Sequence, residues 1–376
     1  MLASTTCILW ILICNSVCDG LKPYCPCDNH EKFHAKCEEG LEALAEVNQS
    51  VSNNMGCSCL CQDGYDIYYH RNPSEKYKWY RICGNKFFVD VVRSQHFRGK
   101  KGGIIYWIAQ DGVIMSLAGR RRLFELGQPL VAHDLKLPIT SDVVFMPDFH
   151  YISYDGYRDL VDQFNQWNAE HTFESKHPQV FWRGAPNGLR MRAVDISLDY
   201  SYMNMGASSV KGGGQNLTEL VANGDGRYKP RIKEPDWIHY RGLVDIDGHA
   251  NAWGLYWRLA SGSVVFKVES NWTNAYIKEL KDGMNYVKVK ADLTNLSNLT
   301  RVVTENDAYS LEFMKKISRN ARKLAKKYSY QNEVARVAKE LTKMFERNED
   351  VASLNTFSPA KHSAIEATNA TSTAPA

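Results

Sequence analysis

Residues 240–269 read YRGLVDIDGHANAWGLYWRLASGSVVFKVE, and this stretch decides the fold of the chain. Its apolar run at 243–246 predicts a strand, and a turn with one glycine follows. Apolar residues spaced by three and four from Ala252 to Leu259 predict a helix, and the β-branched run at 264–268 predicts a buried strand. Strand, helix and strand in this order indicate one right-handed βαβ crossover.

A crossover of this kind places a helix N-terminus at the carboxyl ends of the strands, where phosphate is well held. The stretch therefore favours a phosphate-containing ligand, with a helix that starts near His249. Many crossovers bind no ligand, and from this stretch alone that alternative stays open.

Two other segments place polar residues directly after short strands. Residues 142–146 predict a strand that leads into Asp148, and residues 179–182 predict a strand followed by a glycine-punctuated loop and a helix at 189–198. An acid just beyond the carboxyl end of a strand sits where open α/β sheets hold their ligands. For Asp148 the alternative is a turn or N-cap residue.

The second of these units carries arginines, with Arg183 in the loop and Arg190 in the first turn of the helix. Guanidinium forks match phosphate oxygens and keep their charge, although solvated surface arginines would show the same pattern. The glycine-rich segment 206–215 lacks the residue order of a nucleotide P-loop, so we expect a mobile surface loop there.

Composition restricts the class of protein. The chain has 376 residues, enough for two domains of ordinary size, and 44% hydrophobic residues, which is typical of a globular protein. A net charge of +4 without a coherent basic stripe argues against a nucleic-acid partner. The weaker patterns predict a strand at 87–89, a hairpin at 103–118, helices at 157–167 and 274–280, a strand at 286–290, two amphipathic helices within 306–347, and a disordered tail over 350–376.

The N-terminus is typical of a secretory protein. Residues 7–14 are apolar and small residues follow up to Cys18, so residues 1–18 are expected to be a cleaved signal peptide. No other stretch is apolar enough to predict a stable membrane span. We expect the lumen of the endoplasmic reticulum or Golgi, or secretion. Sequons for glycosylation begin at Asn48, Asn216, Asn271, Asn295, Asn298 and Asn369.

All ten cysteines lie at or before residue 83, and seven remain after cleavage near Cys18. In an oxidising lumen these seven predict a disulfide-bonded N-terminal segment of unknown connectivity. Zinc is the alternative, but the C-x-C-x-C run lacks the usual C-x-x-C pairs. The odd number leaves one thiol for other chemistry. The seven are Cys25, Cys27, Cys37, Cys57, Cys59, Cys61 and Cys83.

Three motifs in the same order resemble those of glycosyltransferase family 90, the capsule-associated and Rumi-type (KDEL-motif-containing) enzymes. Residues 181–190 (FWRGAPNGLR) resemble the family's F-R-G loop. Residues 244–248 (VDIDG) with 259–267 (LASGSVVFK) resemble its N/D-I-D-G and L-x-S-G-S-V-V-x-K core. Glu269-Ser270 followed by 285–293 (NYVKVKADL) resembles its E-S and H-Y-V-P-V-x-x-D-L segment.

The resemblance implies a GT-B-like α/β fold, in which two Rossmann-like domains enclose a cleft. It also implies inverting transfer of glucose or xylose from UDP-glucose or UDP-xylose to a protein serine, for example on an EGF-like module, or to a glycan. Such enzymes need neither a metal nor another cofactor. The expected divisions are a cysteine-rich segment at 19–100, an acceptor-side domain at 101–175 completed by part of the C-terminal helices, and a donor domain at 176–349.

Site residues follow from the resemblance by position. Asp148 falls at the place of the aspartate that takes the proton of the acceptor hydroxyl. Donor-binding positions supply positive groups, backbone amides or hydrogen bonds to the nucleotide-sugar. They are Arg183, Gly184, Arg190, Asp247, Gly248, Arg258, Ser261, Ser263 and Glu269.

The chain also departs from the family pattern. Phe145 replaces the asparagine before the catalytic aspartate, and alignment on Gly262 puts Gly254 where the family carries a helix arginine. Arg258 lies one turn later, so its side chain starts about 6 Å further along the helix axis. This change predicts an altered donor, weaker activity or loss of catalysis.

Two other readings compete with this one. Asp245 and Asp247 spell D-x-D, which would suit a metal-dependent GT-A transferase, although the pair lies on a strand that enters the crossover. A secreted, cysteine-rich binding protein that keeps the fold without catalysis would also fit the departures at Phe145 and Gly254.

Overall fold

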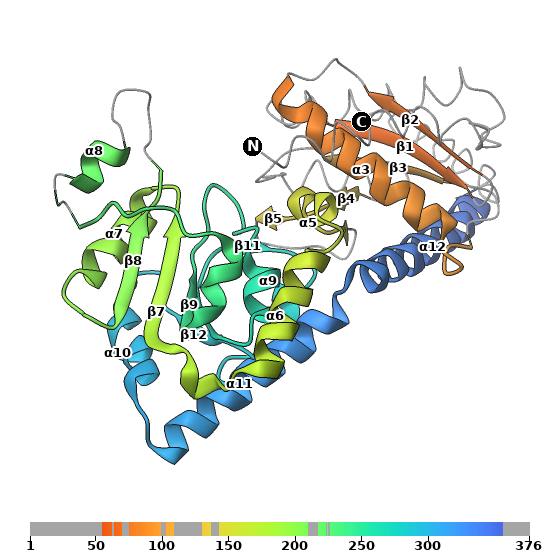
Figure 1. Cartoon of the computed structure of the whole chain (residues 1–376). Helices are drawn as coiled ribbons and strands as arrows, with labels where there is room; N and C mark the ends of the chain where they lie inside the picture. Colours follow the sequence, from red (N-terminus) through yellow and green to blue (C-terminus); the bar gives the residue numbers. More distant parts are fainter. Residues whose placement is uncertain are drawn as a thin grey trace, which may run out of the picture.

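The computed structural model describes residues 55–61, 64–69, 75–98, 103–108, 130–136, 143–209, 217–222, 224 and 226–355. Within these ranges the chain forms two five-stranded sheets and a pair of short strands (Figure 1).

The sheet that contains the deciding stretch is entirely parallel. Its order is β12-β10-β9-β7-β8, so the chain crosses over between neighbouring strands. Val264–Val268 is buried at every position, as expected for a strand that is covered on both faces. The predicted mixed α/β architecture with a parallel sheet is therefore confirmed. The strands are β7 (His177–Gly184), β8 (Met203–Ala207), β9 (Tyr240–Asp245), β10 (Val264–Val268) and β12 (Val287–Val289).

The predicted crossover is confirmed, but its helix begins later than expected. β9 and β10 are parallel neighbours, and α9 (Leu255–Ala260) connects them. The helix starts at Leu255 rather than near His249. The reason is that the Asp247 carboxylate accepts the Ala252 N–H at 2.8 Å, which holds the intervening residues in a loop. α9 is thus only six residues long.

The second sheet has the order β2-β1-β3-β4-β6. β1 pairs antiparallel with β2 and β3, whereas β3, β4 and β6 run parallel. β1 and β2 were not predicted, because their glycines, cysteines and tyrosines show no clear alternation of apolar residues. The second strand of the predicted hairpin at 103–118 lies outside the described residues. The strands are β1 (Met55–Cys61), β2 (Gly64–Tyr69), β3 (Gly103–Ile108), β4 (Leu130–Ala132) and β6 (Val143–Phe145).

The predicted strand at 87–89 is wrong, because these residues lie in the helix α3 (Glu75–Arg93). Cys83, Phe87 and Val91 follow each other at helical spacing and are buried together. A short apolar run alone does not distinguish a strand from a buried helix face.

Two long C-terminal helices connect the regions of the two sheets, as predicted from their amphipathic pattern. α11 (Ala308–Lys327) contacts α9 and β10, whereas α12 (Tyr330–Asn355) contacts α3 and β6 (Figure 1). α12 runs past residue 350, where the disordered tail was expected to begin. The other helices are α5 (Phe149–Ser153), α6 (Arg158–Glu170), α7 (Gly188–Ser197), α8 (Leu217–Ala222) and α10 (Leu296–Thr300).

Shorter elements complete the fold. Of the helix predicted at 274–280, the structure keeps only a single 3-10 turn, Ile277–Glu279. β5 (Leu135–Lys136) pairs antiparallel with β11 (Trp272–Thr273), which ties the chain after β4 to the chain after β10. Among the described residues, no helix combines the length and apolar character that crossing a bilayer requires.

Several predictions concern residues that the structure does not describe. The signal peptide, three of the cysteines and three sequons lie outside the described ranges, namely residues 1–18, Cys25, Cys27, Cys37, Asn48, Asn216 and Asn369. Cys57, Cys59 and Cys61 lie in β1, and Cys83 is buried in α3. The disulfide framework stays a prediction. Asn271 and Asn298 are exposed, and Asn295 is half-buried.

A buried lysine at the amino end of β7 makes stability depend on pH. Lys176 is 2% exposed, and its Nζ donates to the Ile238 carbonyl at 2.5 Å. Burial lowers its pKa from 10.5 to about 7, and the unfolded chain therefore binds one more proton between these values. The contribution of Lys176 to the unfolding free energy therefore falls as the pH is lowered from about 10.5 to about 7, and it changes no further below that range.

We therefore expect a Lys176→Met variant to remove this slope. From pH 7 to pH 9 the unfolding free energy of the wild type should gain about 2 kcal/mol relative to the variant, since one proton contributes about 1.4 kcal/mol per pH unit. Urea denaturation of both proteins at the two pH values measures the difference. If the difference in unfolding free energy between the two proteins is the same at pH 7 and pH 9, the pKa of Lys176 is not lowered in the folded state.

Candidate functional site

A cavity of about 1000 Å³ lies where the carboxyl ends of β7 and β9 face the α5–α6 segment. Both strands point their carboxyl ends toward one edge of the parallel sheet, which is where ligands of such sheets bind. Its wall combines arginines with tryptophans and tyrosines. The predicted site residues that line it are Arg183, Gly184, Arg190, Gly248 and Arg258.

Arg183 is fixed by neutral groups. Its guanidinium donates to the carbonyl oxygens of Trp182 and Asn204 at 2.9 and 2.8 Å and to that of Pro230 at 3.3 Å. The Asn204 side-chain oxygen accepts a further bond at 2.8 Å. Burial without a counter-charge lowers the pKa of Arg183 to about 10. An anion in the cavity would relieve this unfavourable burial.

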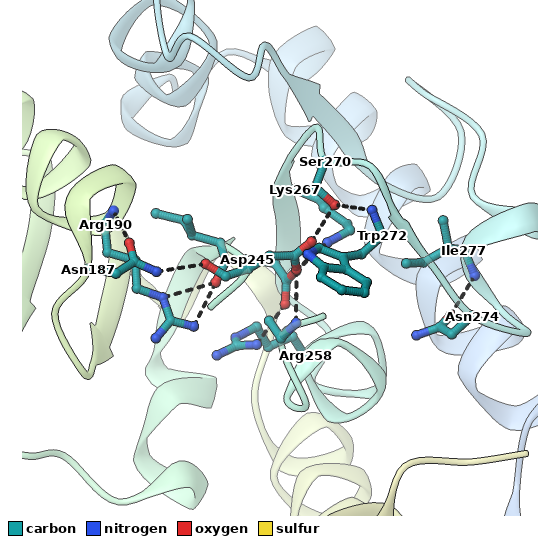
Figure 2. A network of polar contacts seen from close by, with 12 residues as sticks. Asn187, Arg190, Asp245, Arg258, Lys267, Ser270, Trp272, Asn274 and Ile277 are labelled. Carbon is teal, nitrogen blue, oxygen red and sulfur yellow. Dashed lines mark hydrogen bonds and ion pairs between the residues drawn. The ribbon is translucent and has the colours of Figure 1, made fainter. Parts of the chain in front are cut away.

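Arg190 is held in the same way by the backbone. Its Nε and Nη2 donate to the Ile246 carbonyl at 3.2 and 2.9 Å, and Nη1 donates to the Ala185 carbonyl at 3.1 Å (Figure 2). The Asn187 side chain caps α7 by accepting the Arg190 N–H at 2.8 Å. Burial, reinforced by the nearby Arg258 charge, lowers the pKa of Arg190.

Arg258 folds back along its own helix over Gly254. A Cβ atom at position 254 would lie 2.5 Å from Nη1 of Arg258, so only glycine leaves room for this guanidinium. The rings of Trp237 and Trp257 lie 5.1 and 4.7 Å from it, at cation–π distance. Nη1 is bound to Asp245 at 2.7 Å, whereas the buried Nε has no hydrogen-bond partner within the part of the chain that the structure describes.

These three side chains leave N–H groups for a ligand. Each guanidinium has five donors, of which Arg183 uses four, Arg190 three and Arg258 one. Among the described residues neither Arg183 nor Arg190 forms an ion pair. The arginine end of the cavity is therefore suited to an anion with several oxygens.

Behind this wall lies a buried cluster of four charges. Asp245 is fully buried and binds Arg258 at 2.7 Å and Lys267 at 2.8 Å, and Lys267 also reaches Asp247 at 3.0 Å (Figure 2). Burial alone would lower the pKa of Lys267, but the two carboxylates outweigh it and raise the pKa above its ordinary value. Lys267 was not singled out from the sequence, since a lysine in an apolar strand gives no sign of its partners.

Asp247 shapes the loop after β9 and does not line the cavity. One of its oxygens accepts from Ala252 and Lys267, and the other accepts from Ser270 Oγ at 2.5 Å. Both acids of the D-x-D sequence thus have their oxygens bound to protein donors, a set that does not fit a metal-ligand pair. In the described ranges, no group of three or more His, Cys, Asp or Glu side chains is placed to hold a metal ion.

Besides Asp247, three more predicted donor-binding residues are not part of the cavity wall. The buried hydroxyls of Ser261 and Ser263 donate to the carbonyls of Arg258 and Tyr240, at 2.7 and 2.6 Å. Glu269 is exposed and forms an ion pair with Lys288 at 3.1 Å. The serines stabilise the end of α9 and the start of β10, so their place in the motif is explained by packing.

Asp148 caps α5, with one carboxylate oxygen accepting the Tyr151 N–H at 2.8 Å. The residue is 8% exposed and is not part of the cavity wall, but His150, two residues later, is. Burial is the main cause that raises the pKa of the cavity residue Tyr157, and the Asp148 carboxylate is the second. The structure thus shows the capping role and places the acid near the cavity.

A second acid was missed in the sequence. Asp134 and His133 follow β4, which is the parallel neighbour of β6, so they lie at the same sheet edge as Asp148. Both are buried, with His133 Nε2 3.3 Å from an Asp134 oxygen and the His133 ring 5.0 Å from that of Phe149. The signal available was an acid after a three-residue apolar run, which is too short to predict a strand.

The turn between α5 and α6 is left-handed over three consecutive residues. Asp155, Gly156 and Tyr157 have φ of 50°, 74° and 55°. For the two residues other than glycine this backbone costs about 1–3 kcal/mol each, and it persists only where the surroundings hold it. Lys86 of α3 does so by binding Asp155 at 2.8 Å. The turn presents Tyr154 and Tyr157 to the cavity, which the sequence did not predict.

Comparison with known families agrees with this arrangement. The sequence profile described as glycosyl transferase family 90 matches residues 136–371. This segment contains the parallel sheet, the arginine wall and the buried charge cluster. The chain belongs to glycosyltransferase family 90.

Individual relatives of this family 90 chain match a shorter segment. Protein O-glucosyltransferase 1 of Mus musculus is 32% identical over 91 residues, which are 23% of this chain and 23% of the mouse protein. Protein O-glucosyltransferase 1 of Homo sapiens is 31% identical over 87 residues, 22% of each chain. The match thus spans about a quarter of the length of these relatives.

Proposed function

We propose that the chain is an inverting, metal-independent glycosyltransferase that uses UDP-glucose or UDP-xylose in the secretory pathway. The observation that carries the proposal is the wall of Arg183, Arg190 and Arg258, which line one cavity and keep N–H donors for a ligand. The family and the glucosyltransferase relatives support the class of reaction. The acceptor is proposed to be a protein serine or a glycan hydroxyl.

The wall suits a diphosphate leaving group. As the sugar leaves UDP, negative charge gathers on the phosphate oxygens, and fixed donors that meet this charge lower the barrier. Metal-dependent transferases use a divalent cation for this purpose, whereas here Arg183, Arg190 and Arg258 supply the positive charge. The two sheets beside the cavity support a GT-B arrangement.

The reaction is a single displacement at the anomeric carbon. The acceptor oxygen forms a bond to this carbon as the bond to the UDP oxygen breaks, and UDP leaves with the bonding electrons. The hydroxyl proton passes to a carboxylate on the opposite face, for which we propose Asp148. Asp134, at the same sheet edge, is the alternative candidate for the carboxylate that takes the proton.

Replacing Gly254 by alanine tests the position of Arg258 without changing any charge. The added methyl group would lie 2.5 Å from Nη1 of Arg258 and 2.9 Å from Nε1 of Trp257, so the guanidinium must move. Loss of one charge-assisted phosphate contact costs about 1.5–3 kcal/mol, and UDP should therefore bind roughly 10- to 150-fold more weakly. Calorimetric titration with UDP measures the change.

The matched control is Gly188→Ala, since a Cβ there meets nothing within 4 Å. This variant should bind UDP like the wild type. If Gly254→Ala also binds UDP normally, Arg258 is not a phosphate ligand.

The function itself is tested with intact donors. We expect UDP to raise the melting temperature of the full chain, and UDP-glucose or UDP-xylose to be turned over in buffer containing a chelator. Absence of both a UDP-induced shift and turnover would refute a UDP-sugar enzyme. Turnover only after addition of manganese would refute metal independence.

A second candidate is a binding protein with the same fold that has lost catalysis. It is favoured by Asp148, which caps α5 and is not part of the cavity wall. UDP binding without turnover of either donor, across a panel of acceptors, would select this candidate over the enzyme.

A further inference from the structure

We propose that Tyr154 and Tyr157 form the acceptor subsite of the cavity, and that the acceptor bound there is a neutral saccharide. The proposal rests on the glycosyl transfer proposed above and names the class of its second substrate. Both tyrosines line the cavity from the α5–α6 side, opposite the ends of β7 and β9.

The Tyr154 ring is the exposed end of a stack of aromatic rings, which supports it from behind. Tyr154 is 46% exposed, and its ring stacks on that of Tyr157 at 5.5 Å and 17°. Tyr157 stacks in turn on the buried Tyr256 at 6.3 Å and 19°. Half-exposed aromatic rings of this kind offer their face to the C–H side of a sugar ring, while nearby polar groups take its hydroxyls.

The same end of the cavity is electrically balanced. Its acids are all paired: Asp155 with Lys86 at 2.8 Å, Asp159 with Arg158 at 3.3 Å and Glu234 with Arg231 at 3.1 Å. The arginine end described above has no such compensation at Arg183. Charge therefore divides the cavity into an end for an anionic donor and an end for a neutral ligand.

The tyrosines adjoin the loop that leads to Arg258. The Tyr157 hydroxyl lies 3.5 Å from the Trp253 carbonyl, and the Trp253 ring lies 3.6 Å from that of His150. A sugar on Tyr154 would therefore lie next to the loop that contains Gly254, beside the donor end.

A peptide acceptor is less suited to this wall. One common way to bind an extended peptide is to add it as a strand to an open sheet edge. The strand residues of the wall, Trp182 to Gly184, belong to β7, which already pairs with β8 and β9 on its two sides. β7 is thus an inner strand of this sheet and not an edge strand to which a peptide could be added.

The left-handed turn keeps the tyrosines in this position. Besides the contact of Asp155 with Lys86, the Gly156 N–H donates to the Tyr151 carbonyl at 2.8 Å. The Tyr151 hydroxyl donates to the carbonyl of Tyr328 at 2.6 Å, just before α12. A strained turn that is held from α3 and from the junction of α11 and α12 indicates that the geometry of the tyrosine pair matters for the site.

The test is saturation-transfer NMR of the full chain with saturating UDP and four neutral disaccharides: maltose, cellobiose, lactose and xylobiose. We expect at least one to bind, and Tyr154→Ala to weaken it about tenfold. Tyr154→Phe keeps the ring and should bind within about threefold of the wild type. Tyr200→Ala is the matched control and should have no effect, since Tyr200 is an exposed tyrosine outside the cavity wall whose ring lies 5.4 Å from that of Tyr202.

UDP affinity, measured in the same samples, separates this proposal from the proposed function. It should be unchanged in all three variants, because Tyr154 lies at the neutral end. Absence of UDP binding in the wild type would refute the proposed function. Normal UDP binding without binding of any of the four saccharides, or with binding unaffected by Tyr154→Ala, would overturn the saccharide subsite alone. Binding of a serine-containing peptide in their place would also overturn it.

Discussion

Replacing Asp148 by asparagine is expected to lower sugar transfer about 10²- to 10⁴-fold, the usual contribution of a general base. Asparagine is as good an N-cap as aspartate, so its side-chain oxygen can still accept the Tyr151 N–H that holds the start of α5. The fold and the UDP affinity should therefore persist. Initial rates with a donor and a competent acceptor measure the effect, with UDP titration as the check on folding.

The chain offers a matched control for this substitution. Asp307 caps α11 in the same way, accepting the Ser310 N–H at 2.9 Å, and lies outside the cavity wall. Asp307→Asn should leave transfer unchanged. If Asp148→Asn transfers sugar normally whereas Asp134→Asn does not, the base is Asp134, and Asp148 only caps its helix.

A Lys267→Met variant is expected to lower the free energy of unfolding by about 3–5 kcal/mol, the cost of breaking a buried ion pair by removing one partner. Asp245 is fully buried and would keep only Arg258, while Asp247 would lose the cation that holds it at 3.0 Å. Methionine has nearly the same length as lysine, so the loss reports on charge more than on volume. Urea denaturation at neutral pH measures it.

The control is Lys288→Met, which removes an exposed ion pair with Glu269. Exposed pairs are screened by water, and this variant should unfold at the wild-type midpoint. If Lys267→Met unfolds at that midpoint too, the cluster must be hydrated, and its carboxylates would not depend on Lys267.

Local pattern was enough to predict several of the parallel strands in the two sheets. The runs at 142–146, 179–182 and 264–268 each became a strand, because a buried parallel strand is apolar along its whole length. The same reasoning failed at 87–89, where a run of three apolar residues is too short to show a helical or a strand period. It also failed at β1, where cysteines and glycines interrupt the apolar pattern of the strand. The onset of α9 was missed because it depends on where the Asp247 carboxylate points.

The residues of the candidate site were also predicted only in part. Arg183, Arg190 and Arg258 were identified from sequence as donor-binding candidates, and all three line the cavity. Glu269 was also a candidate, but it forms a surface ion pair instead. A match to a motif position does not by itself identify the role of the side chain.

The sequence by itself determined the crossover at 240–269, the parallel sheet around it and the family, since these follow from the order of apolar runs and short motifs. The tertiary structure alone decided what those residues do. From the sequence, glycine at 254 was predicted to remove a phosphate-binding arginine, yet it makes the space that Arg258 occupies. The D-x-D acids are held by Lys267 and Arg258 in a buried cluster. Both outcomes depend on side chains that meet only in the fold, because charge pairing and close contact are set by distance in space.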